Sequence, residues 1–217
     1  MTIKTEKTAS IDIKTRREEE ILEAAATLFA ECGYSQADTQ TLADRLGVGK
    51  GTIYRYFPSK QELFLAAVDR LMRQLHENIT HAISDEFQDP IDRIFHAMNA
   101  YLKFFSDRPE LVELLIQERA YFKDRAKPTF IEHNEKFVQQ WRGEFLAMIA
   151  QGRVREMPFE KFNDVMSDLL YGTMFTNYFA RRNRPTAEQA NDIYDFALYG
   201  ILSDSEREKR IRMREEG

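Results

Sequence analysis

Apolar residues recur every three or four positions over most of this chain, a spacing that places them on one face of an α-helix. The first clear run covers about residues 15–31, with an apolar face of Ile21, Leu22, Ala25, Leu28 and Phe29. Further helices are predicted at about 39–46, 50–57, 60–84, 90–106, 110–121, 129–151, 159–182 and 187–202. There is no useful length of β-alternation and no internal repeat, so the pattern predicts an all-α fold.

Residues that begin or end helices stand at the edges of these runs. Asp38 suits the N-cap of the second helix, and Ser59 with Glu62 forms a capping box for the fourth. Gly33 and Gly47 follow the first and second helices, where glycine takes a left-handed terminal conformation at least cost. The fourth helix has an apolar face along its whole length, so we expect it to link two halves of the molecule rigidly.

The most informative stretch is residues 42–64, which reads LADRLGVGKGTIYRYFPSKQELF. It predicts a short helix, a tight glycine turn, a second short helix and the start of a longer one. Helix-turn-helix units that enter the DNA major groove are built in this way. The inward apolar positions leave a polar and aromatic surface on the second helix, made of Lys50, Thr52, Tyr54, Arg55 and Tyr56.

Three linked segments resemble the DNA-binding domain of the TetR family of bacterial transcriptional regulators. They are ILEAAATLFAECGY at 21–34, GVGKGTIY at 47–54 and YFPSK at 56–60, accompanied by LA at 42–43 and ELF at 62–64. A bare helix-turn-helix pattern is weak evidence, whereas linked segments in the right order and spacing are specific. The chain departs from the family at Gly49, where serine is common, and this removes one possible hydroxyl contact to phosphate.

The resemblance implies which residues contact DNA. By matching motif position they are Thr39, Lys50, Thr52, Tyr54, Tyr56 and Lys60. Lys50 and the backbone N–H of Gly51 lie at a helix N-terminus, which favours anions such as phosphate. Arg55 is our candidate for reading guanine, because its guanidinium fork matches the O6/N7 edge of that base. The alternative is that these are ordinary exposed residues of a surface helix.

The net charge of −5 argues against binding nucleic acid by bulk charge, but it leaves room for a localised site. Residues 1–60 hold nine basic and nine acidic residues, so the rest of the chain carries the whole excess. DNA binding must therefore rest on a small face with Lys50, Arg55 and Lys60, and its affinity should depend strongly on salt. The N-terminal arm could add Lys14, Arg16 and Arg17.

Composition places the chain among soluble globular proteins, with 43% apolar and 31% charged residues. No apolar run approaches the ~20 residues needed to cross a bilayer, and the polar N-terminus lacks the apolar centre of a signal peptide. A single cysteine excludes an intramolecular disulfide, and together these features favour the cytoplasm, without a membrane partner. We divide the chain into a flexible arm (1–14), a helix-turn-helix DNA-binding domain (15–60), a helical ligand-binding and dimerisation domain (61–203) and a charged tail (204–217).

Aromatic residues are concentrated between positions 95 and 179. They can form the core of a helical bundle, or several can line a cavity for a hydrophobic or aromatic inducer, as this region does in the TetR family. Both interpretations stay open. The candidate ligand-binding residues are Phe95, Asn99, Phe105, Gln117, Tyr121, Phe137, Trp141, Phe175 and Tyr178. Further possible polar contacts are Glu118, Asn134 and Asn177.

The last two predicted helices carry a dimer hypothesis. The first of them is apolar or small around much of its surface, so more than one side must be covered. In the TetR family these helices form a four-helix interface between two subunits, and the alternative is a buried helix within one subunit. The candidate interface residues are Val165, Leu169, Gly172, Thr173, Thr176, Ile193, Phe196 and Tyr199.

Other chemistry finds little support in the sequence. Residues 47–52 are not a P-loop, because Asp44 and Gly51 stand where a glycine and a magnesium-binding hydroxyl are required. The four histidines have no metal-ligand spacing, and no catalytic triad stands out. We therefore expect no enzyme activity, no cofactor and no metal.

These observations predict a homodimeric regulator that binds a double-stranded, pseudo-palindromic operator and responds to a small molecule. A repressor released by a hydrophobic or aromatic effector fits best. The alternatives are a DNA-binding protein without a small-molecule inducer and an enzyme on a helical scaffold. The sequence does not identify the effector, the operator or the regulated genes.

Overall fold

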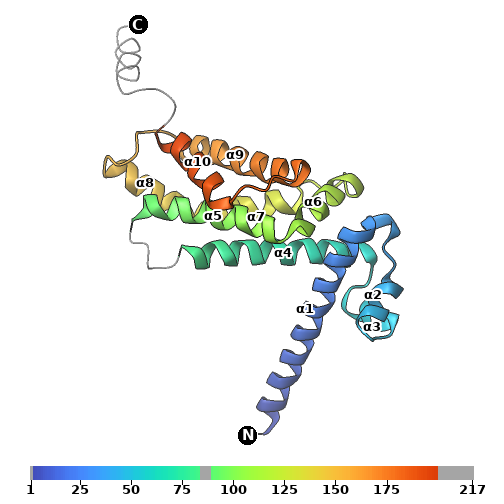
Figure 1. Cartoon of the computed structure of the whole chain (residues 1–217). Coiled ribbons are helices and arrows are strands. Elements are labelled where there is room, and N and C mark those ends of the chain that lie inside the picture. Colours follow the sequence, from blue (N-terminus) through green and yellow to red (C-terminus); the bar gives the residue numbers. More distant parts are fainter. Residues whose placement is uncertain (1, 84–88, 200–217) are drawn as a thin grey trace, which may run out of the picture.

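The computed structural model describes the backbone of residues 2–83 and 89–199, and the side chains of 14–83 and 89–199. Within these ranges the chain is helical and has no strand, which confirms the predicted fold class. Its helices, drawn in Figure 1, are α1 (Thr2–Gln36), α2 (Thr39–Arg45), α3 (Lys50–Tyr56), α4 (Lys60–Ala82), α5 (Pro90–Asp107), α6 (Pro109–Tyr121), α7 (Thr129–Val138), the 3₁₀ turn η1 (Gln139–Trp141), α8 (Arg142–Ala150), α9 (Phe159–Ala180) and α10 (Thr186–Leu198). Within the described ranges, no helix has the length and apolar character that a membrane span requires.

The helix starts in the N-terminal half follow the predicted capping residues. The Asp38 carboxylate accepts a hydrogen bond from the Gln40 backbone N–H at 2.8 Å. The Ser59 hydroxyl accepts one from the Glu62 N–H at 3.1 Å and lies at the same distance from the Glu62 carboxylate. These side chains satisfy N–H groups that have no partner inside their own helices.

Two features differ from the sequence-based expectation. Helix α1 begins at Thr2, so the segment 1–14 that we expected as a flexible arm is helical from its second residue. The helix expected over 129–151 is interrupted by η1, a tighter turn that places the Trp141 ring 6.5 Å from the ring of Phe137. Gly33 does interrupt α1, with φ 76° and ψ 155°. The charged tail, 204–217, lies outside the described residues.

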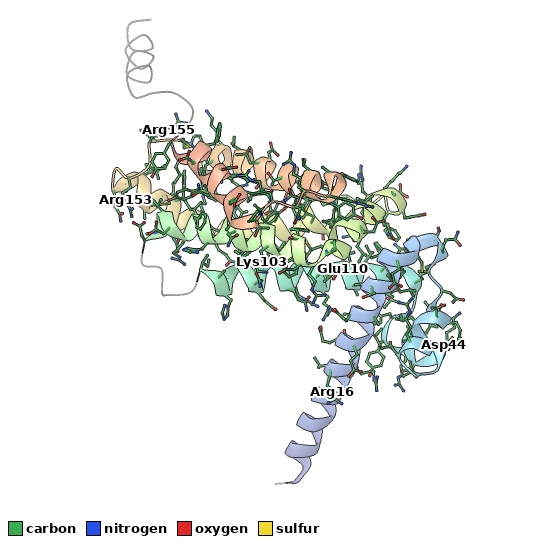
Figure 2. All side chains as sticks on the ribbon, viewed as in Figure 1. Arg16, Asp44, Lys103, Glu110, Arg153 and Arg155 are labelled. Carbon is green, nitrogen blue, oxygen red and sulfur yellow. The ribbon has the colours of Figure 1, made fainter. Side chains whose placement is uncertain are left out.

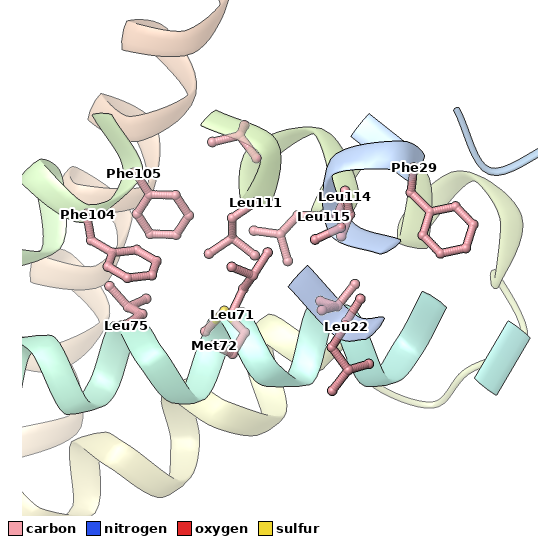
Figure 3. Packing of buried hydrophobic residues seen from close by; sticks show 14 of the residues in the cluster. Leu22, Phe29, Leu71, Met72, Leu75, Phe104, Phe105, Leu111, Leu114 and Leu115 are labelled. Atoms are coloured by element: carbon pink, nitrogen blue, oxygen red, sulfur yellow. The ribbon is translucent and has the colours of Figure 1, made fainter. Parts of the chain in front are cut away.

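Helix α4 lies at the centre of the hydrophobic core. Its buried face contacts α1 on one side, and α5, α6 and α7 along the rest of its length. Figure 3 shows Leu71, Met72 and Leu75 of α4 facing apolar side chains of α5 and α6. Full burial of one such side chain stabilises the fold by about 1.5–3 kcal/mol. The α1–α3 unit and the α5–α10 bundle therefore share one continuous core, and α4 belongs to both.

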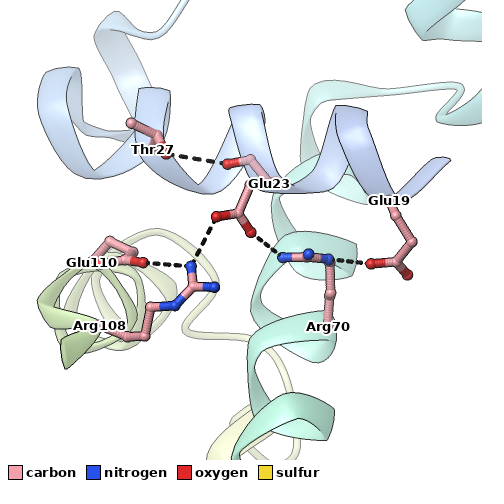
Figure 4. Close-up of polar contacts among 6 residues, drawn as sticks. All are labelled: Glu19, Glu23, Thr27, Arg70, Arg108 and Glu110. Atoms are coloured by element: carbon pink, nitrogen blue, oxygen red, sulfur yellow. Dashed lines mark hydrogen bonds and ion pairs between the residues drawn. The ribbon is translucent and has the colours of Figure 1, made fainter. Parts of the chain in front are cut away.

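A charged network joins α1 to the rest of the molecule beside this core (Figure 4). The Arg70 guanidinium of α4 is 10% exposed and donates hydrogen bonds to Glu19 and Glu23 of α1. Arg108, at the corner between α5 and α6, donates to Glu23 at 2.8 Å and to Glu110 at 3.1 Å. Glu23 thus connects three segments that are distant in sequence.

The two guanidinium groups determine the charge state of Glu23. Burial alone would raise its pKa, but the hydrogen bonds and charges of Arg70 and Arg108 outweigh burial and hold the pKa below the ordinary value of 4.5. A carboxyl whose pKa is lowered by folding contributes stability above its unfolded pKa, and that contribution is lost as the pH falls through the folded pKa. The network should therefore stabilise the protein at neutral pH and weaken in acid.

We predict that Arg70→Met lowers the free energy of unfolding at neutral pH, near the lower end of the about 1.5–3 kcal/mol typical of charged hydrogen bonds. The lower end applies because the side chains of Glu19 and Glu23 are each 45% exposed. Urea denaturation measures the difference, which should shrink well below the ordinary pKa of glutamate. The control is Arg16→Met, because Arg16 is 77% exposed and pairs only loosely with Glu20 at 3.7 Å. Equal effects of the two variants would contradict a specific role for the network.

Candidate nucleic-acid interface and interior cavity

Helices α2 and α3 form a compact unit whose apolar side faces α1 and α4. Leu42 and Ala43 of α2 and Ile53 of α3 are fully buried. Gly47 turns the chain between the two helices with φ 62°, a left-handed conformation that glycine adopts without strain. The turn is closed by a 3.0 Å hydrogen bond from the Val48 N–H to the Ala43 carbonyl. The unit therefore fixes the orientation of α3 against the core.

The outward side of α3 carries the residues expected to contact DNA. Gly51, Tyr54 and Arg55 are exposed, and Lys50, Thr52 and Tyr56 are half-buried. Tyr54 is 39% exposed, and the Arg55 guanidinium lies 5.7 Å from the centre of the Tyr56 ring. Five polar or aromatic side chains and one glycine of a single short helix thus share a solvent-facing surface, as the sequence predicted. We call this set the α3 surface.

Neighbouring residues hold this surface in place. Thr39 is buried, and its hydroxyl is hydrogen-bonded to the Tyr54 hydroxyl at 3.1 Å, so it lies behind Tyr54. Lys50 donates to the Asp38 carboxylate at 3.2 Å. A hydrogen bond from the Gln40 backbone and then the Lys50 ammonium lower the pKa of Asp38. The carboxylate is therefore charged at neutral pH and keeps Lys50 oriented.

Lys60 is the one expected contact that lies outside α2 and α3. Its ammonium donates to the Ser35 carbonyl at 3.1 Å and lies 5.0 Å from the centre of the Tyr34 ring. It therefore ties the start of α4 to the end of α1.

Glycine at position 49 leaves the N-cap of α3 without a side-chain hydrogen bond. A Cβ added there would meet nothing within 4 Å, so the space around Gly49 does not require glycine.

The basic residues near the start of α1 are partly engaged with an acid on the same helix. Arg17 pairs with Glu20 at 2.7 Å, and Arg16 lies 3.7 Å from the same carboxylate. Figure 2 shows Arg16 on the part of α1 that projects past the bundle. Asp44 of α2 is labelled at the same end of the molecule. Their addition to a DNA contact stays a prediction.

A second candidate site is a cavity of about 150 Å³ inside the C-terminal bundle. It is lined by residues of α4, α5, α7, η1, α8 and α9, and its wall is mostly apolar. The aromatic residues that line it are Tyr101, Phe130, Phe137, Trp141, Phe145, Phe159 and Phe162. Its polar lining residues are His76, Asn134, Glu144, Asn163 and Ser167. The bundle is therefore not filled completely by its aromatic core.

Two of the nine expected ligand-binding residues, Phe137 and Trp141, line this cavity. Phe95 packs against Tyr194 of α10, and Phe175 packs between Tyr171 and Phe179. Tyr121 is exposed near Tyr34.

Of the polar candidates, Asn134 lines the cavity, and the others make contacts elsewhere. Asn99 accepts a hydrogen bond from Thr186 at 3.3 Å, and Gln117 donates to the Phe29 carbonyl at 3.0 Å. Phe105 and Tyr178 line a separate, more polar surface hollow between α5, α6, α9 and α10, together with Asn177. Sequence reasoning chose residues by type, and only the packing of the helices decides which of them face the cavity.

His76 lines the cavity, and His133 lies beside it outside the lining, with the two ring centroids 5.5 Å apart. The His76 ring stacks on Phe137 with centroids 4.4 Å apart, and His133 is hydrogen-bonded to Asp69 at 2.7 Å. Burial, aided by the nearby His133, lowers the pKa of His76 to about 4, so His76 is neutral at neutral pH. Among the side chains that are described, no group of three or more His, Cys, Asp or Glu could hold a metal ion.

An apolar surface covers the outer faces of α9 and α10. Val165 of α9 is 53% exposed and Phe196 of α10 is 62% exposed. The hydroxyls of Thr173 and Thr176 donate to carbonyls of their own helix at 2.7 Å, so they add little polarity to this surface. Of the predicted interface residues, the exposed ones are Val165, Leu169, Gly172, Phe196 and Tyr199, and the half-buried ones are Thr173, Thr176 and Ile193. Large exposed apolar surfaces of this kind mark interaction sites.

Comparison with known proteins agrees with the geometry of the N-terminal half. The family described as "Bacterial regulatory proteins, tetR family" matches residues 21–67. The chain is 33% identical to the nucleoid occlusion factor SlmA of Vibrio campbellii over 112 residues, 51% of this chain and 57% of the relative. The matched part thus spans little more than half the length of that relative. SlmA of Pasteurella multocida is 26% identical over 144 residues, 66% of this chain and 70% of the relative.

Solved structures share the whole fold at lower identity. The regulator PfmR of Thermus thermophilus has a TM-score of 0.65 and 23% identity, covering 84% of this chain and 99% of that one. FadR of Bacillus subtilis, in complex with stearoyl-CoA, has a TM-score of 0.72 and 18% identity, covering 85% and 99%. These similarities extend the agreement from the helix-turn-helix unit to the C-terminal bundle.

If the α3 surface contacts DNA, Lys50→Ala should weaken binding to duplex DNA of every sequence. Loss of one phosphate contact should reduce the slope of log affinity against log salt by about 0.9. Fluorescence anisotropy over a salt series measures both quantities. Arg73→Ala is the matched control, because Arg73 is an exposed base of α4 paired with Asp69 and outside the α3 surface. An unchanged slope for Lys50→Ala would remove Lys50 from the interface.

Proposed function

The chain belongs to the TetR family of bacterial regulatory proteins, and we propose that it is a homodimeric, cytoplasmic repressor that a small hydrophobic or aromatic molecule releases from a pseudo-palindromic operator. The α3 surface supplies the contacts to DNA, with Arg55 reading guanine in the major groove. The cavity in the bundle receives the effector. The observation that carries this proposal is that one helix, α4, forms part of both the core beneath the α3 surface and the wall of the cavity.

Helix α4 supports a mechanical connection between the two sites. Near its N-terminus, Leu63 and Phe64 are buried with the residues of α1 and α3. Two turns later, Met72, Leu75 and His76 line the cavity. An effector that displaces these side chains shifts a helix on which the α2–α3 unit rests. Because packed cores have discrete arrangements, such a shift can change the separation of two recognition helices.

A second connection runs through the segment between α6 and α7. Gln117 donates to the Phe29 carbonyl of α1 at 3.0 Å. The neighbouring Glu118 is buried and accepts hydrogen bonds from the backbone N–H and the hydroxyl of Thr129, at 2.9 and 2.8 Å. Thr129 begins α7, which contributes Phe130 and Phe137 to the cavity. Two adjacent side chains of α6 therefore hold α1 and α7.

The apolar surface of α9 and α10 supports a two-fold symmetric dimer. Its residues form a stripe at helical spacing, and Gly172 within it allows close approach of a second helix. A symmetric dimer places two α3 helices on successive turns of one DNA face, which accounts for a pseudo-palindromic operator.

Leu169→Glu should convert the dimer to a monomer and weaken operator binding by at least about tenfold, because a single half-site contact remains. Light scattering after size exclusion measures the mass, and circular dichroism checks the fold. Leu146→Glu is the control, because Leu146 of α8 is 49% exposed and Leu169 is 40% exposed. A monomeric wild-type protein that binds a palindrome with full affinity would contradict this part of the proposal.

The repressor function is tested by selecting bound sequences from random duplex DNA, with Lys50→Ala/Tyr54→Ala as control. Recovery of a pseudo-palindrome that the control variant fails to enrich supplies the operator probe. Compounds that quench Trp141, the only tryptophan of the chain, are then tested for release of that probe. Recovery of no specific sequence at low salt would overturn the proposal.

Thr129→Val should separate ligand binding from DNA release. The variant loses the hydroxyl contact with Glu118 but keeps nearly the same shape, so Trp141 quenching and operator affinity should persist. The coupling between the sites, typically about 1–3 kcal/mol, should fall measurably but not vanish, because α4 and the Thr129 N–H bond to Glu118 remain. Arg125 pairs with Glu118 at 3.1 Å and with Glu132 at 3.3 Å. Glu132→Gln is the control, because it weakens only the second of these pairs and leaves Glu118 and Thr129 in contact. Operator release as efficient as in the wild type would exclude the α6–α7 connection from the coupling.

The second candidate function is a DNA-binding protein that acts without a small-molecule inducer. Similarity to the nucleoid occlusion factor SlmA favours it. This function would be distinguished from the first by a protein that binds a specific operator and stays bound when compounds occupy the cavity. The apolar cavity, with its lining of aromatic rings, favours the ligand-responsive repressor.

A further inference from the structure

We propose that the cavity takes a compact, ring-containing molecule whose polar end donates a hydrogen bond to the carboxylate of Glu144. This inference rests on the proposed function, because it names the class of effector that the same cavity accepts. It depends on three features: the volume of the cavity, the charge of its wall and one carboxylate oxygen in that wall.

The volume limits the size of the molecule. An apolar cavity of about 150 Å³ accepts a molecule of the size of benzene. Aromatic rings from α5, α7, η1, α8 and α9 surround this space, so a flat ring can pack edge-to-face or offset against several of them.

The charge of the wall limits the polar group of the molecule. Among the described residues that line the cavity there is one carboxylate, Glu144, and there is no lysine or arginine. His76 is neutral at neutral pH and stacks on Phe137. A ligand carboxylate or phosphate would therefore lie beside the Glu144 carboxylate with no lysine or arginine in the cavity lining to pair with it, which is costly inside a protein. The wall selects neutral or cationic polar groups.

One oxygen of Glu144 is available as an acceptor. Oε1 accepts a hydrogen bond from Arg93 at 2.9 Å, whereas Oε2 is buried and has no hydrogen-bond partner among the described residues. Arg93 lies outside the cavity lining, with its guanidinium 5.9 Å from the centre of the Trp141 ring. It balances the charge of the carboxylate from one side and leaves the second oxygen for a ligand. Buried acceptors of this kind gain most from a donor.

The other polar groups of the cavity wall discriminate less between ligands. The Ser167 hydroxyl lies 3.4 Å from the Asn163 side-chain oxygen, so these two groups face each other. Amides and hydroxyls can donate as well as accept, and they do not discriminate between ligand donors and acceptors. An ionised carboxylate only accepts. Glu144 is therefore the group that specifies a donor, such as a phenol hydroxyl or an amine.

The test uses a matched pair of probes, phenol and anisole, which differ in whether the oxygen carries a proton. Quenching of Trp141 reports binding of either compound without reference to DNA. We expect the wild-type protein to bind the phenol about tenfold or more tightly than the anisole. Glu144→Met should abolish this preference by weakening the phenol, while the anisole binds as before. Equal wild-type affinities, or a preference that survives Glu144→Met, would overturn the proposal.

Two further variants make the result independent of folding defects. Arg93→Met/Glu144→Met removes both partners of the ion pair, so no unpaired charge is left half-buried, and it should show the same loss of preference. Glu160→Met is the matched control, because Glu160 pairs with Arg142 outside the cavity lining and should leave the preference intact. If Glu160→Met also lost the preference for the phenol, general destabilisation would explain the effect, and the role of Glu144 would be overturned.

Operator release is measured separately, so that the two proposals can fail separately. Preferential binding of the phenol supports the ligand class even if the operator stays bound, and in that case the coupling in the proposed function fails. Release of the operator by a compound without a donor, while neither probe binds, would overturn the ligand class and leave the repressor intact.

Discussion

The burial of one face of α4 is the constraint on which the rest of the structure depends. Its apolar side chains, from Leu63 to Ile79, are covered first by α1 and then by α5, α6 and α7. A 23-residue helix buried along its length cannot bend locally without opening the core, so a displacement at one end is carried to the other. The hydrogen bonds of Arg70 and Arg108 to Glu23 lie beside this face and fix the angle at which α1 crosses it.

The α2–α3 unit could be predicted from the sequence because its determinants are local. Asp38 and Ser59 cap helices that begin at the next residue, and Gly47 takes its left-handed turn for reasons that depend only on its own backbone. The buried positions of α2 and α3 follow the helical spacing of apolar residues within a few turns. Such signals lie within ten residues of the feature they specify, so a single sequence contains them completely.

The cavity could not be predicted in the same way. Phe137 and Phe175 look equivalent in the sequence, yet the first faces the cavity and the second packs between aromatic rings of α9. The choice depends on the rotation of each helix against neighbours that are distant in the chain. Glu144 gives no local signal either, because its position matters only once Arg93, far earlier in the chain, occupies one of its oxygens. The η1 turn, which shifts the register between α7 and α8, is likewise invisible in the hydrophobic pattern.

The start of α7 differs in kind from the starts of α2 and α4. Pro128 precedes it and provides no side-chain cap, and the first N–H group of the helix is satisfied by the Glu118 carboxylate of α6. A negative charge at this position is also attracted to the positive end of the helix dipole. Helix α7 therefore takes its cap from another helix, so its first turn is a tertiary feature and not a local one. A peptide spanning 129–138 alone would lack that cap, and in the intact protein the length of α7 is tied to the position of α6.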